Sequence, residues 1–359
     1  MKLLIATPLY PPEPGGPATH TKLLETGLPG KGISVEVVKF SEVKSYPKVV
    51  RHILYFFKVF RASRGKDVLL VQDTLSCGLP AALAAGIRGL PFVVRVPGDH
   101  AWEQGSQRFG VRADIVSFQK MSVPWQVRIL KTLQSWVAQR ADLVIVPSKS
   151  FASVVAEWGV APERLKAIYH GMRELKGGVA PTQPPPHPYM VSIGRLVPWK
   201  GFEFLIRLLP QLPEWRLVIV GNGPDRAMLE AAARETGVSD RVLLTGGVPH
   251  DEALGWCVSA DAFVLNTGFE SFSFQVLEAM ALGCRTITNE VGSIPELITG
   301  GEGVLLQPDD TEAYVRALKS VREDPEAWEK RRAAGVKRAA WFSTERMLAE
   351  TADNLKRLV

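Results

Sequence analysis

Apolar and polar positions alternate along this chain in short, regular blocks. Brief runs of β-branched and other apolar residues are typical of strands buried on both faces, and segments of helical length separate them. Such alternation predicts parallel α/β sheets. The predicted strands are 2–7, 33–40, 67–72, 91–96, 142–147, 189–194, 216–221, 241–246, 261–266 and 285–289.

One stretch interrupts the alternation. Residues 176–188 read KGGVAPTQPPPHP, a density of Pro and Gly that neither a helix nor a strand tolerates. We interpret this stretch as a linker between two Rossmann-like, doubly wound domains, residues 1–175 and 189–340, which face each other across a cleft. A last helix, residues 341–359, is expected to pack back onto the N-terminal domain.

Charge divides unequally between the halves. Residues 1–175 carry 23 Lys and Arg against 13 Asp and Glu, whereas residues 176–359 carry 20 against 24. The basic half would suit nucleic acid, an anionic membrane face or a phosphorylated substrate. Because no zinc-finger, RNP-type or basic-zipper signature accompanies the charge, we expect no nucleic-acid partner.

Composition also bears on the compartment. The sequence has no apolar run long enough to span a membrane and no signal-peptide cleavage site, so a cytoplasmic protein is expected, with peripheral association at the inner face of the membrane as a further expectation. The cysteines Cys77, Cys257 and Cys284 are odd in number and lack metal-ligand spacing. Buried reduced thiols are therefore favoured over a disulfide or a zinc site.

The stretch GFESFSFQVLEAMALG, residues 268–283, follows the predicted strand 261–266. A helix is predicted to begin around Phe272–Phe274, with Ser271 or Ser273 as N-cap and Gly283 at its end. The first-turn amides of such a helix suit a diphosphate.

Two glutamates of this stretch are candidates for sugar binding. Glu278 lies among apolar helix residues, and a buried carboxylate needs donors, which the two hydroxyls of a ribose would supply. Glu270 lies in the loop, where a sugar on that diphosphate would present hydroxyls. On this stretch alone, a solvent-facing helix residue and a plain loop charge fit equally well.

The loops after the neighbouring strands carry compatible groups. Arg195 and Lys200, in GRLVPWKG, follow strand 189–194 and can both reach one diphosphate. The turns VGNGPDR and GGVPH follow the next two strands. Each turn alone is weak evidence, but the ordered series is strong evidence for a nucleotide-sugar site.

The series GRLVPWKG, VGNGPDR and FESFSFQVLEAMALG resembles the family 4 retaining glycosyltransferases, which have the GT-B fold. The resemblance covers nearly the whole chain, including the opening YPPEPGGP and the segment VPSKSFASVVAEWGVAPERLKAIYHGM. It implies a hexosyltransferase that moves a sugar from a nucleotide-diphosphate sugar to a glycan or lipid-linked acceptor, in the synthesis of a cell-envelope polysaccharide or glycolipid.

The resemblance also implies roles for individual residues. Arg195 and Lys200 would hold the leaving diphosphate, Glu278 the ribose and Glu270 the donor sugar, while His100 would contact the transferred sugar. The catalytic residues implied by the resemblance are His100, Glu270, Arg195 and Lys200. The alternative for His100 is a structural role as a hydrogen-bonded loop histidine. The implied donor-binding residues are Gly15, Gly16, Arg195, Lys200, Gly221, Val248, Glu270, Phe272, Ser273, Phe274 and Glu278, and the acceptor-binding residues are Tyr10, Asp99 and Trp102.

No Asp-x-Asp motif occurs in the sequence. Side-chain cations and a helix N-terminus are expected to take the place of a metal, so we expect neither a metal nor another cofactor. Asp309 and Asp310 are interpreted as a helix-capping pair.

In residues 46–66, helical phasing puts Val49, Ile53, Phe56, Phe57 and Phe60 on one face. We interpret this segment as a helix that covers the sheet and keeps its basic side in solvent. A peripheral membrane contact is the other interpretation, and the two are compatible.

Two other functions stay open. One is an enzyme of another reaction type on the same fold, such as a sugar-nucleotide epimerase or a phosphorylase. The other is a non-catalytic sugar-nucleotide-binding protein. The complete series of loops, with Glu270 eight positions before Glu278, argues against the first, and slow donor hydrolysis would exclude the second.

Overall fold

Two compact units make up the protein. Unit 1 comprises Met1–Gly171 and Thr344–Val359, and unit 2 comprises Met172–Ser343. Lys176, the first residue of the predicted linker, lies outside the described residues. The structure, a computed structural model, describes residues 1–13, 15–172, 175 and 177–359.

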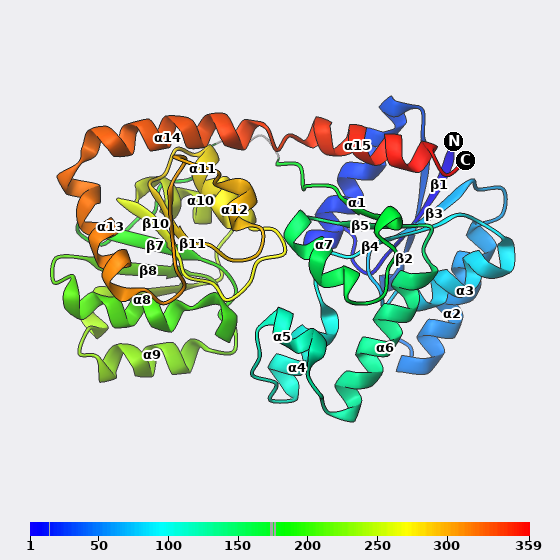
Figure 1. Ribbon diagram of the computed structural model, residues 1–359, viewed down its shortest axis with the longest axis horizontal. Coiled ribbons are helices and arrows are strands. Elements are labelled where there is room, and N and C mark those ends of the chain that lie inside the picture. Colours follow the sequence, from blue (N-terminus) through cyan, green and yellow to red (C-terminus); the bar gives the residue numbers. More distant parts are fainter. Residues whose placement is uncertain (14, 173–174, 176) are drawn as a thin grey trace. The chain divides into compact units, whose positions relative to one another are not determined.

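Unit 1 is an α/β unit in which helices follow strands (Figure 1). Its helices and strands are β1 Lys2–Thr7, α1 Gly16–Gly27, β2 Ser34–Lys39, α2 Lys48–Ala62, β3 Val68–Val71, α3 Gly78–Arg88, β4 Phe92–Arg95, α4 His100–Arg108, α5 Ile115–Lys120, α6 Trp125–Arg140, β5 Leu143–Val146, α7 Lys149–Ala156, β6 Leu165–Ala167 and α15 Thr344–Lys356.

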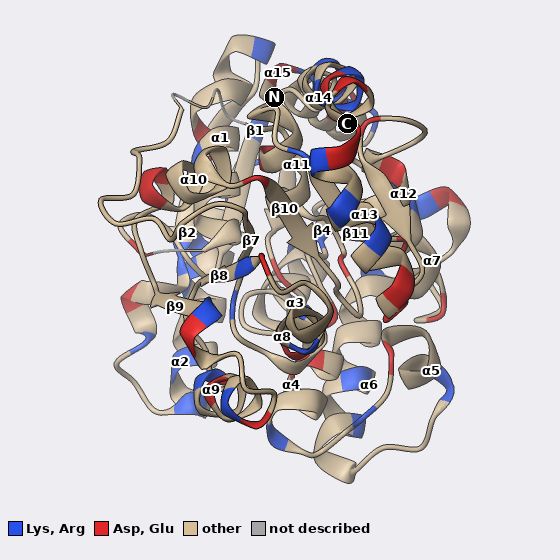
Figure 2. Cartoon of the chain, turned by 90° about the vertical axis from the view of Figure 1, so that its left-hand side faces the viewer, with Lys and Arg blue, Asp and Glu red and all other residues tan. Residues whose placement is uncertain are grey.

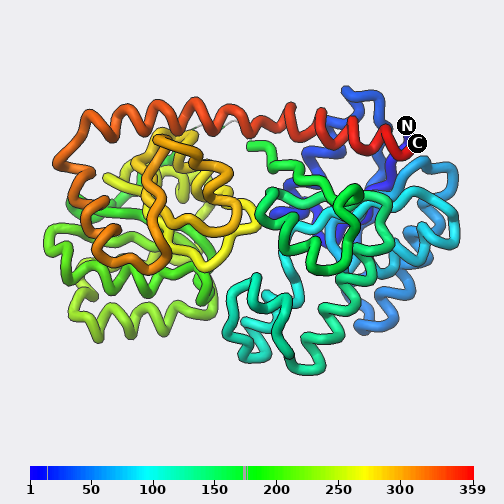
Figure 3. The backbone as a smooth tube through the Cα atoms, in the orientation of Figure 1, coloured from blue at the N-terminus to red at the C-terminus, as the bar shows by residue number. Residues whose placement is uncertain are grey.

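The sheet of unit 1 is parallel, with the strand order β2-β1-β3-β4-β5-β6. Strands β3, β4 and β5 are buried at every position, as expected for the apolar runs VLLV, FVV and LVIV, and Arg95 at the end of β4 is buried with them. One face packs against α1 and α15 through residues such as Leu24, Met347 and Leu355. Figure 3 shows this pairing of the first and last helices within unit 1, with blue α1 beside red α15.

Unit 2 also consists of strands that alternate with helices. Its elements are β7 Tyr189–Ile193, α8 Phe202–Leu208, β8 Arg216–Val220, α9 Arg226–Glu235, β9 Val242–Gly246, α10 His250–Ser259, β10 Ala262–Leu265, α11 Phe274–Ala281, β11 Thr286–Asn289, α12 Ile294–Leu297, β12 Val304–Leu306, α13 Thr311–Glu323 and α14 Pro325–Ala340.

The sheet of unit 2 has the order β12-β11-β10-β7-β8-β9, and all its pairings are parallel. Helices α8 and α9 lie on one face of this sheet, and α10 and α11 lie on the other (Figure 1). Strands β7, β10 and β11 carry no charged residue, whereas α8 and α9 carry both signs (Figure 2). The chain order reverses between β7 and β10, which is the switch point where ligands bind in doubly wound sheets.

The predicted fold class is confirmed, because both sheets are parallel and doubly wound. All ten predicted strands occur. Strands β6 and β12 were not predicted, since each is a three-residue strand at a sheet edge and neither is fully buried. Cys77, Cys257 and Cys284 are buried free thiols, as expected.

Helix α2 corrects one expectation. Val49, Ile53 and Phe57 of the predicted apolar face are 72%, 51% and 59% exposed, so this face does not cover the sheet. Tyr55 and Val59 are buried instead, and the Tyr55 hydroxyl donates to the carbonyl of Val38 in β2 at 2.9 Å. Helical phasing identifies residues that share a face, but not which face packs inward. Within the part of the chain that the structure describes, no helix combines the length and apolarity needed to cross a membrane.

Candidate functional site

The loops that leave β7 and β10 meet at the switch point of unit 2. Gly201, at φ +62°, lets them approach closely, because a Cβ at this position would lie 1.7 Å from the carbonyl oxygen of Asn266. The carbonyl of Trp199 accepts hydrogen bonds from the Gly268 amide at 2.6 Å and the Thr267 hydroxyl at 2.9 Å. The two loops are therefore held together by their own backbone.

This contact brings Lys200 and Glu270 together. Lys200 Nζ lies 2.5 Å from Glu270 Oε1, and both side chains are buried. The carbonyl of Glu270 also accepts from the Ser293 amide at 2.9 Å, which anchors the loop against the segment after β11. Removing one partner of such a pair leaves a buried charge, at a cost of about 3–5 kcal/mol. An ammonium has three hydrogens, so Lys200 can hold Glu270 and still donate to an anion.

The helix predicted after this loop is α11, and it ends near Gly283, which has φ +67°. Ser273 occupies the N-cap position, but its hydroxyl makes no capping bond and, among the described residues, has no hydrogen-bond partner although it is buried. Phe272 and Phe274 meet edge to face with centroids 5.2 Å apart. The first-turn amides of a helix lack intrahelical partners, so this end of α11 can receive an anion.

Glu278 has a partner that the sequence did not indicate. Its Oε1 lies 2.9 Å from His250 Nε2, and its side chain is 20% exposed. The carboxylate is thus neither fully buried nor purely solvent-facing, and it joins α11 to the first residue of α10. A ribose at this position would share the carboxylate with His250.

The other predicted donor residues of unit 2 lie on the neighbouring loops. Arg195 is exposed and follows β7. The Gly221 amide, just after β8, donates to the Gly246 carbonyl at 3.0 Å, and Val248 lies half-buried between β9 and α10. All of them follow the carboxyl ends of strands, where the sequence placed them.

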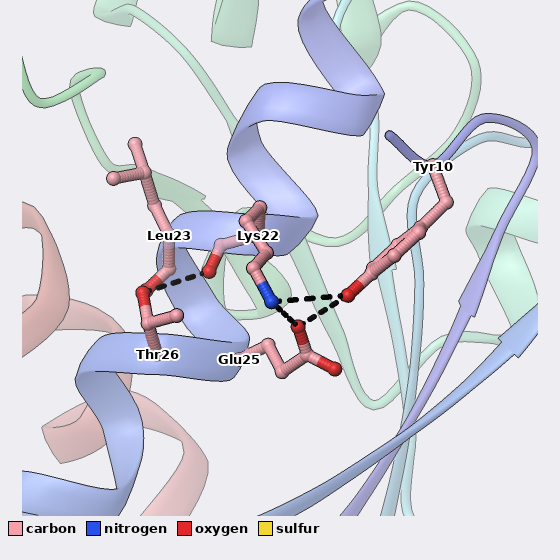
Figure 4. A network of polar contacts seen from close by, with 5 residues as sticks. All are labelled: Tyr10, Lys22, Leu23, Glu25 and Thr26. Carbon is pink, nitrogen blue, oxygen red and sulfur yellow. Dashed lines mark hydrogen bonds and ion pairs between the residues drawn. The ribbon is translucent and has the colours of Figure 1, made fainter. Parts of the chain in front are cut away.

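In unit 1, Tyr10 belongs to a polar network with α1 (Figure 4). Its hydroxyl donates to Glu25 Oε2 at 2.5 Å, and Lys22 Nζ reaches the same oxygen at 2.6 Å. The hydrogen bond to Glu25 raises the pKa of Tyr10. The tyrosine is therefore held in place by α1, and its predicted contact with an acceptor stays a prediction.

Asp99 and Trp102 build the start of α4. Asp99 is buried, caps the helix by accepting from the Trp102 amide at 3.0 Å, and also accepts from the side chains of Gln134 at 2.9 Å and Gln119 at 2.8 Å. The indole N–H of Trp102, which is buried too, donates to the Ala113 carbonyl at 2.9 Å. Both side chains thus support the fold, and their predicted acceptor contacts stay predictions.

His100 is the first residue of α4 and is exposed. Loss of solvation nevertheless lowers the pKa of its ring. Gly15 is the N-cap residue of α1, with φ +143°, and Gly16 is the first residue of this helix. Among the described residues, a Cβ on Gly16 would meet no atom within 4 Å, so this helix end leaves room beside its backbone.

Two family models match the chain. The model described as "glycosyl transferase 4-like domain" matches residues 4–171, and the model described as "glycosyl transferases group 1" matches residues 180–339. The chain is a group 1 glycosyltransferase. This confirms the family suggested by the loop motifs.

Curated relatives agree with this assignment. The glycosyltransferase is 30% identical over 294 residues to a glycogen synthase of Mycobacterium tuberculosis, covering 80% of this chain and 67% of that protein. It is 33% identical over 161 residues to the GDP-mannose-dependent alpha-(1-6)-phosphatidylinositol monomannoside mannosyltransferase of Mycolicibacterium smegmatis, covering 42% of this chain and 41% of that protein.

Solved structures show the fold of the glycosyltransferase to be GT-B. Sucrose-phosphate synthase from Thermosynechococcus elongatus superposes with a TM-score of 0.79 at 19% identity, covering 100% of this chain and 99% of that chain. Anabaena HepE in complex with UDP-glucose gives a TM-score of 0.76 at 20% identity, covering 99% of this chain and 100% of that chain.

His250 is the functional candidate that sequence reasoning missed. The signal was its position at the start of a helix after the GGVP turn, on a loop already assigned to donor binding. Asp310 caps α13 by accepting from the Ala313 amide at 3.0 Å, which confirms half of the predicted capping pair. Asp309 does not cap the helix, because its carboxylate accepts from the side-chain amide of Asn266 at 2.7 Å. Across the described residues, no three His, Cys, Asp or Glu side chains cluster in a way that could hold a metal ion. Metal independence of the glycosyltransferase stays a prediction.

Proposed function

We propose that this glycosyltransferase transfers a hexose, with retention of configuration, from a nucleotide-diphosphate sugar to a glycan or lipid-linked acceptor of the cell envelope. The observation that carries the proposal is the Lys200–Glu270 pair at the switch point of unit 2. A cation and a carboxylate at one point match a donor in which a diphosphate adjoins sugar hydroxyls. Support also comes from relatives named for GDP-mannose and from the UDP-glucose complex of HepE.

In the proposed reaction, the bond between the sugar's anomeric carbon and the diphosphate oxygen breaks. The acceptor hydroxyl attacks on the same face, and its proton passes to the leaving diphosphate oxygen. Lys200, Arg195 and the N-terminus of α11 stabilise the negative charge that develops on this group, which is the main electrostatic contribution. Glu270 orients the sugar hydroxyls and also keeps Lys200 in place.

The test is donor turnover without an acceptor. Wild-type protein is incubated in turn with UDP-, GDP- and ADP-linked hexoses, and nucleotide release is measured, together with the thermal shift that each ligand produces. One nucleotide series should both stabilise the protein and be hydrolysed slowly. If a donor binds tightly but is neither hydrolysed nor transferred to added acceptors, the protein is a non-catalytic binding protein.

We further propose that helix α2 contacts an anionic membrane surface. Val49, Ile53 and Phe57 form an exposed apolar stripe one turn apart, and the same helix carries Lys48, Arg51, Lys58 and Arg61. Exposed apolar residues beside cations suit the boundary between acyl chains and acidic headgroups.

Cosedimentation with vesicles tests the membrane contact. Binding should increase with acidic-lipid content, fall at high salt, and weaken in a Phe57→Ser variant, whereas Val258→Ser, at an exposed apolar residue on α10 of unit 2, serves as the matched control. The proposal would be contradicted if wild-type binding did not depend on the acidic-lipid content and the Phe57→Ser variant bound as well as the wild type.

A further inference from the structure

A buried cation lies at the carboxyl edge of the unit 1 sheet. Arg95, the last residue of β4, is 3% exposed. Its Nη1 donates to Gln72 Oε1 at 3.3 Å, and its Nη2 donates to His170 Nε2 at 2.8 Å. Among the described residues, no carboxylate pairs with this guanidinium. Burial lowers the pKa of Arg95 to about 9, so it remains charged at neutral pH.

The groups around Arg95 have unused hydrogen-bonding capacity. Gln72 Nε2 and His20 Nδ1 are buried and have no partner within the described part of the chain. The His20 ring stands edge-on to His170, with centroids 5.5 Å apart. Burial, together with the charge of Arg95, lowers the pKa values of His20 and His170, which keeps both rings neutral. Among the described residues, the cluster therefore carries one net positive charge and two buried polar atoms without a partner, Gln72 Nε2 and His20 Nδ1.

The position of the cluster is that of a ligand site. Gln72 directly follows β3 and Arg95 ends β4, while β1 and β3, although neighbours, send the chain to opposite faces. Doubly wound sheets bind ligands beyond the carboxyl ends of strands at such a reversal. His20 lies on α1 in the second turn after the open backbone at Gly16, and the residue as a whole is 8% exposed, so only a small part of it meets solvent.

Energetics favour an anion as the missing partner. A buried ion without a counter-ion costs several kcal/mol. If Arg95 only tethered the segments around Gln72 and His170, a neutral hydrogen-bond donor would do the same at a lower cost. A guanidinium presents its donors in a planar fork that matches the oxygens of a phosphoryl group. An amide N–H and an imidazole N–H in the same cluster add donors from other directions.

We propose that Arg95, Gln72 and His20 form a subsite for a phosphoryl group of the acceptor substrate. The inference rests on the proposed function, because it specifies the chemical class of the acceptor as a phosphorylated sugar or a sugar linked to a lipid through phosphate. The diphosphate of the donor has its own cations, Arg195 and Lys200, in unit 2.

The experiment observes the histidines directly. The ring nitrogens of ¹⁵N-histidine-labelled protein are followed by NMR during titration with inorganic phosphate and pyrophosphate. The nucleoside diphosphate that gives the largest thermal shift among UDP, GDP and ADP is present to occupy the donor site. The signals of His20 and His170, assigned from His20→Gln and His170→Gln variants, should shift saturably. Arg95→Met should weaken this binding by about tenfold or more. Arg64→Met removes an exposed positive charge of the same unit and is the matched control.

A second variant keeps the proposal falsifiable should Arg95→Met fold poorly. Gln72→Glu supplies a carboxylate beside Arg95, so it should abolish the phosphate response while raising the melting temperature. Titrations with glucose 1-phosphate and with geranyl diphosphate then distinguish a soluble from a lipid-linked phosphate, by whichever binds more tightly. Three results would contradict the proposed subsite. The first is that the histidine signals of the wild type do not shift with phosphate, the second is that they shift with glucuronate but not with phosphate, and the third is that they shift with phosphate equally in Arg95→Met. Donor hydrolysis by the wild type is measured separately, so failure of the proposed function remains distinguishable.

Discussion

Lys200 in unit 2 and Arg95 in unit 1 occupy comparable places, since each is a buried cation beyond the carboxyl edge of a parallel sheet. Their partners differ. Lys200 has the carboxylate of Glu270 at 2.5 Å, whereas Arg95 has the neutral side chains of Gln72 and His170. A cation that has its counter-ion is complete within the protein, and it can be held rigidly before any substrate arrives. A cation among neutral groups is completed only when an anion binds.

A buried cation therefore has a different meaning when a carboxylate pairs with it than when only neutral groups surround it. In unit 2, pairing preserves the geometry of a reactive group, because two loops and the ion pair fix Lys200. In unit 1, the absence of a carboxylate among the described partners of Arg95 indicates an incomplete site. The two buried cations should therefore respond in opposite ways when their charge is removed.

The largest expected effect is on turnover. Lys200→Met removes the cation beside the departing diphosphate, so donor hydrolysis should fall by about a hundredfold or more. The measurement is nucleotide release at saturating donor. Lys319→Met, on an exposed position of α13 in the same unit, should remain near the wild-type rate. A Lys200→Met enzyme of full activity would remove Lys200 from the candidate site.

Stability provides the direct test of the comparison. Lys200→Met leaves Glu270 buried without its counter-ion and should lower the free energy of unfolding by about 3–5 kcal/mol. Arg95→Met removes an unpaired charge, so in phosphate-free buffer its stability should equal or exceed that of the wild type. Urea denaturation of both variants measures the difference. If Arg95→Met loses as much stability as Lys200→Met, the guanidinium is a structural tether and the contrast between the units is wrong.

The fold was readable from sequence because its strands are runs of apolar residues buried on both faces, as in β3 and β7. The order of the glycine turns then predicted which loops approach the switch point. The sequence did not predict which side of each helix packs against the sheet. The stripe at Val49, Ile53 and Phe57 has helical phasing, yet the buried hydroxyl of Tyr55 determines which side of α2 packs inward.

Pairings between distant residues could not be read from the sequence. Lys200 and Glu270 were each assigned to the donor, but their contact depends on the approach of two loops at Gly201, 65 positions before Asn266 and without any local pattern that marks it. Cys257 and Cys284, which looked unrelated, have their sulfur atoms 3.3 Å apart. The Arg95 cluster combines residues from four separate segments, and no local sequence pattern marks His20 or His170 as its members.

The smallest expected effect concerns Glu278, whose carboxylate is shared in the same way as that of Glu270 but near the surface. If it also accepts the ribose hydroxyls, Glu278→Gln should weaken donor binding by about tenfold, because a charge-assisted hydrogen bond becomes a neutral one. His250→Ala frees the carboxylate from its partner at 2.9 Å and should leave donor affinity unchanged or increase it.

The decisive comparison is a cycle with a 2′-deoxyribose donor, with dissociation constants measured by calorimetry. The wild type should bind this donor more weakly than the ribose donor, and Glu278→Gln should discriminate much less between the two, since the interaction being deleted is already weakened. Strictly additive losses would mean that Glu278 does not touch the ribose. The carboxylate would then serve only its hydrogen bond with His250, which links α10 to α11, and His250→Ala should reduce the stability of unit 2 rather than alter its affinity for the donor.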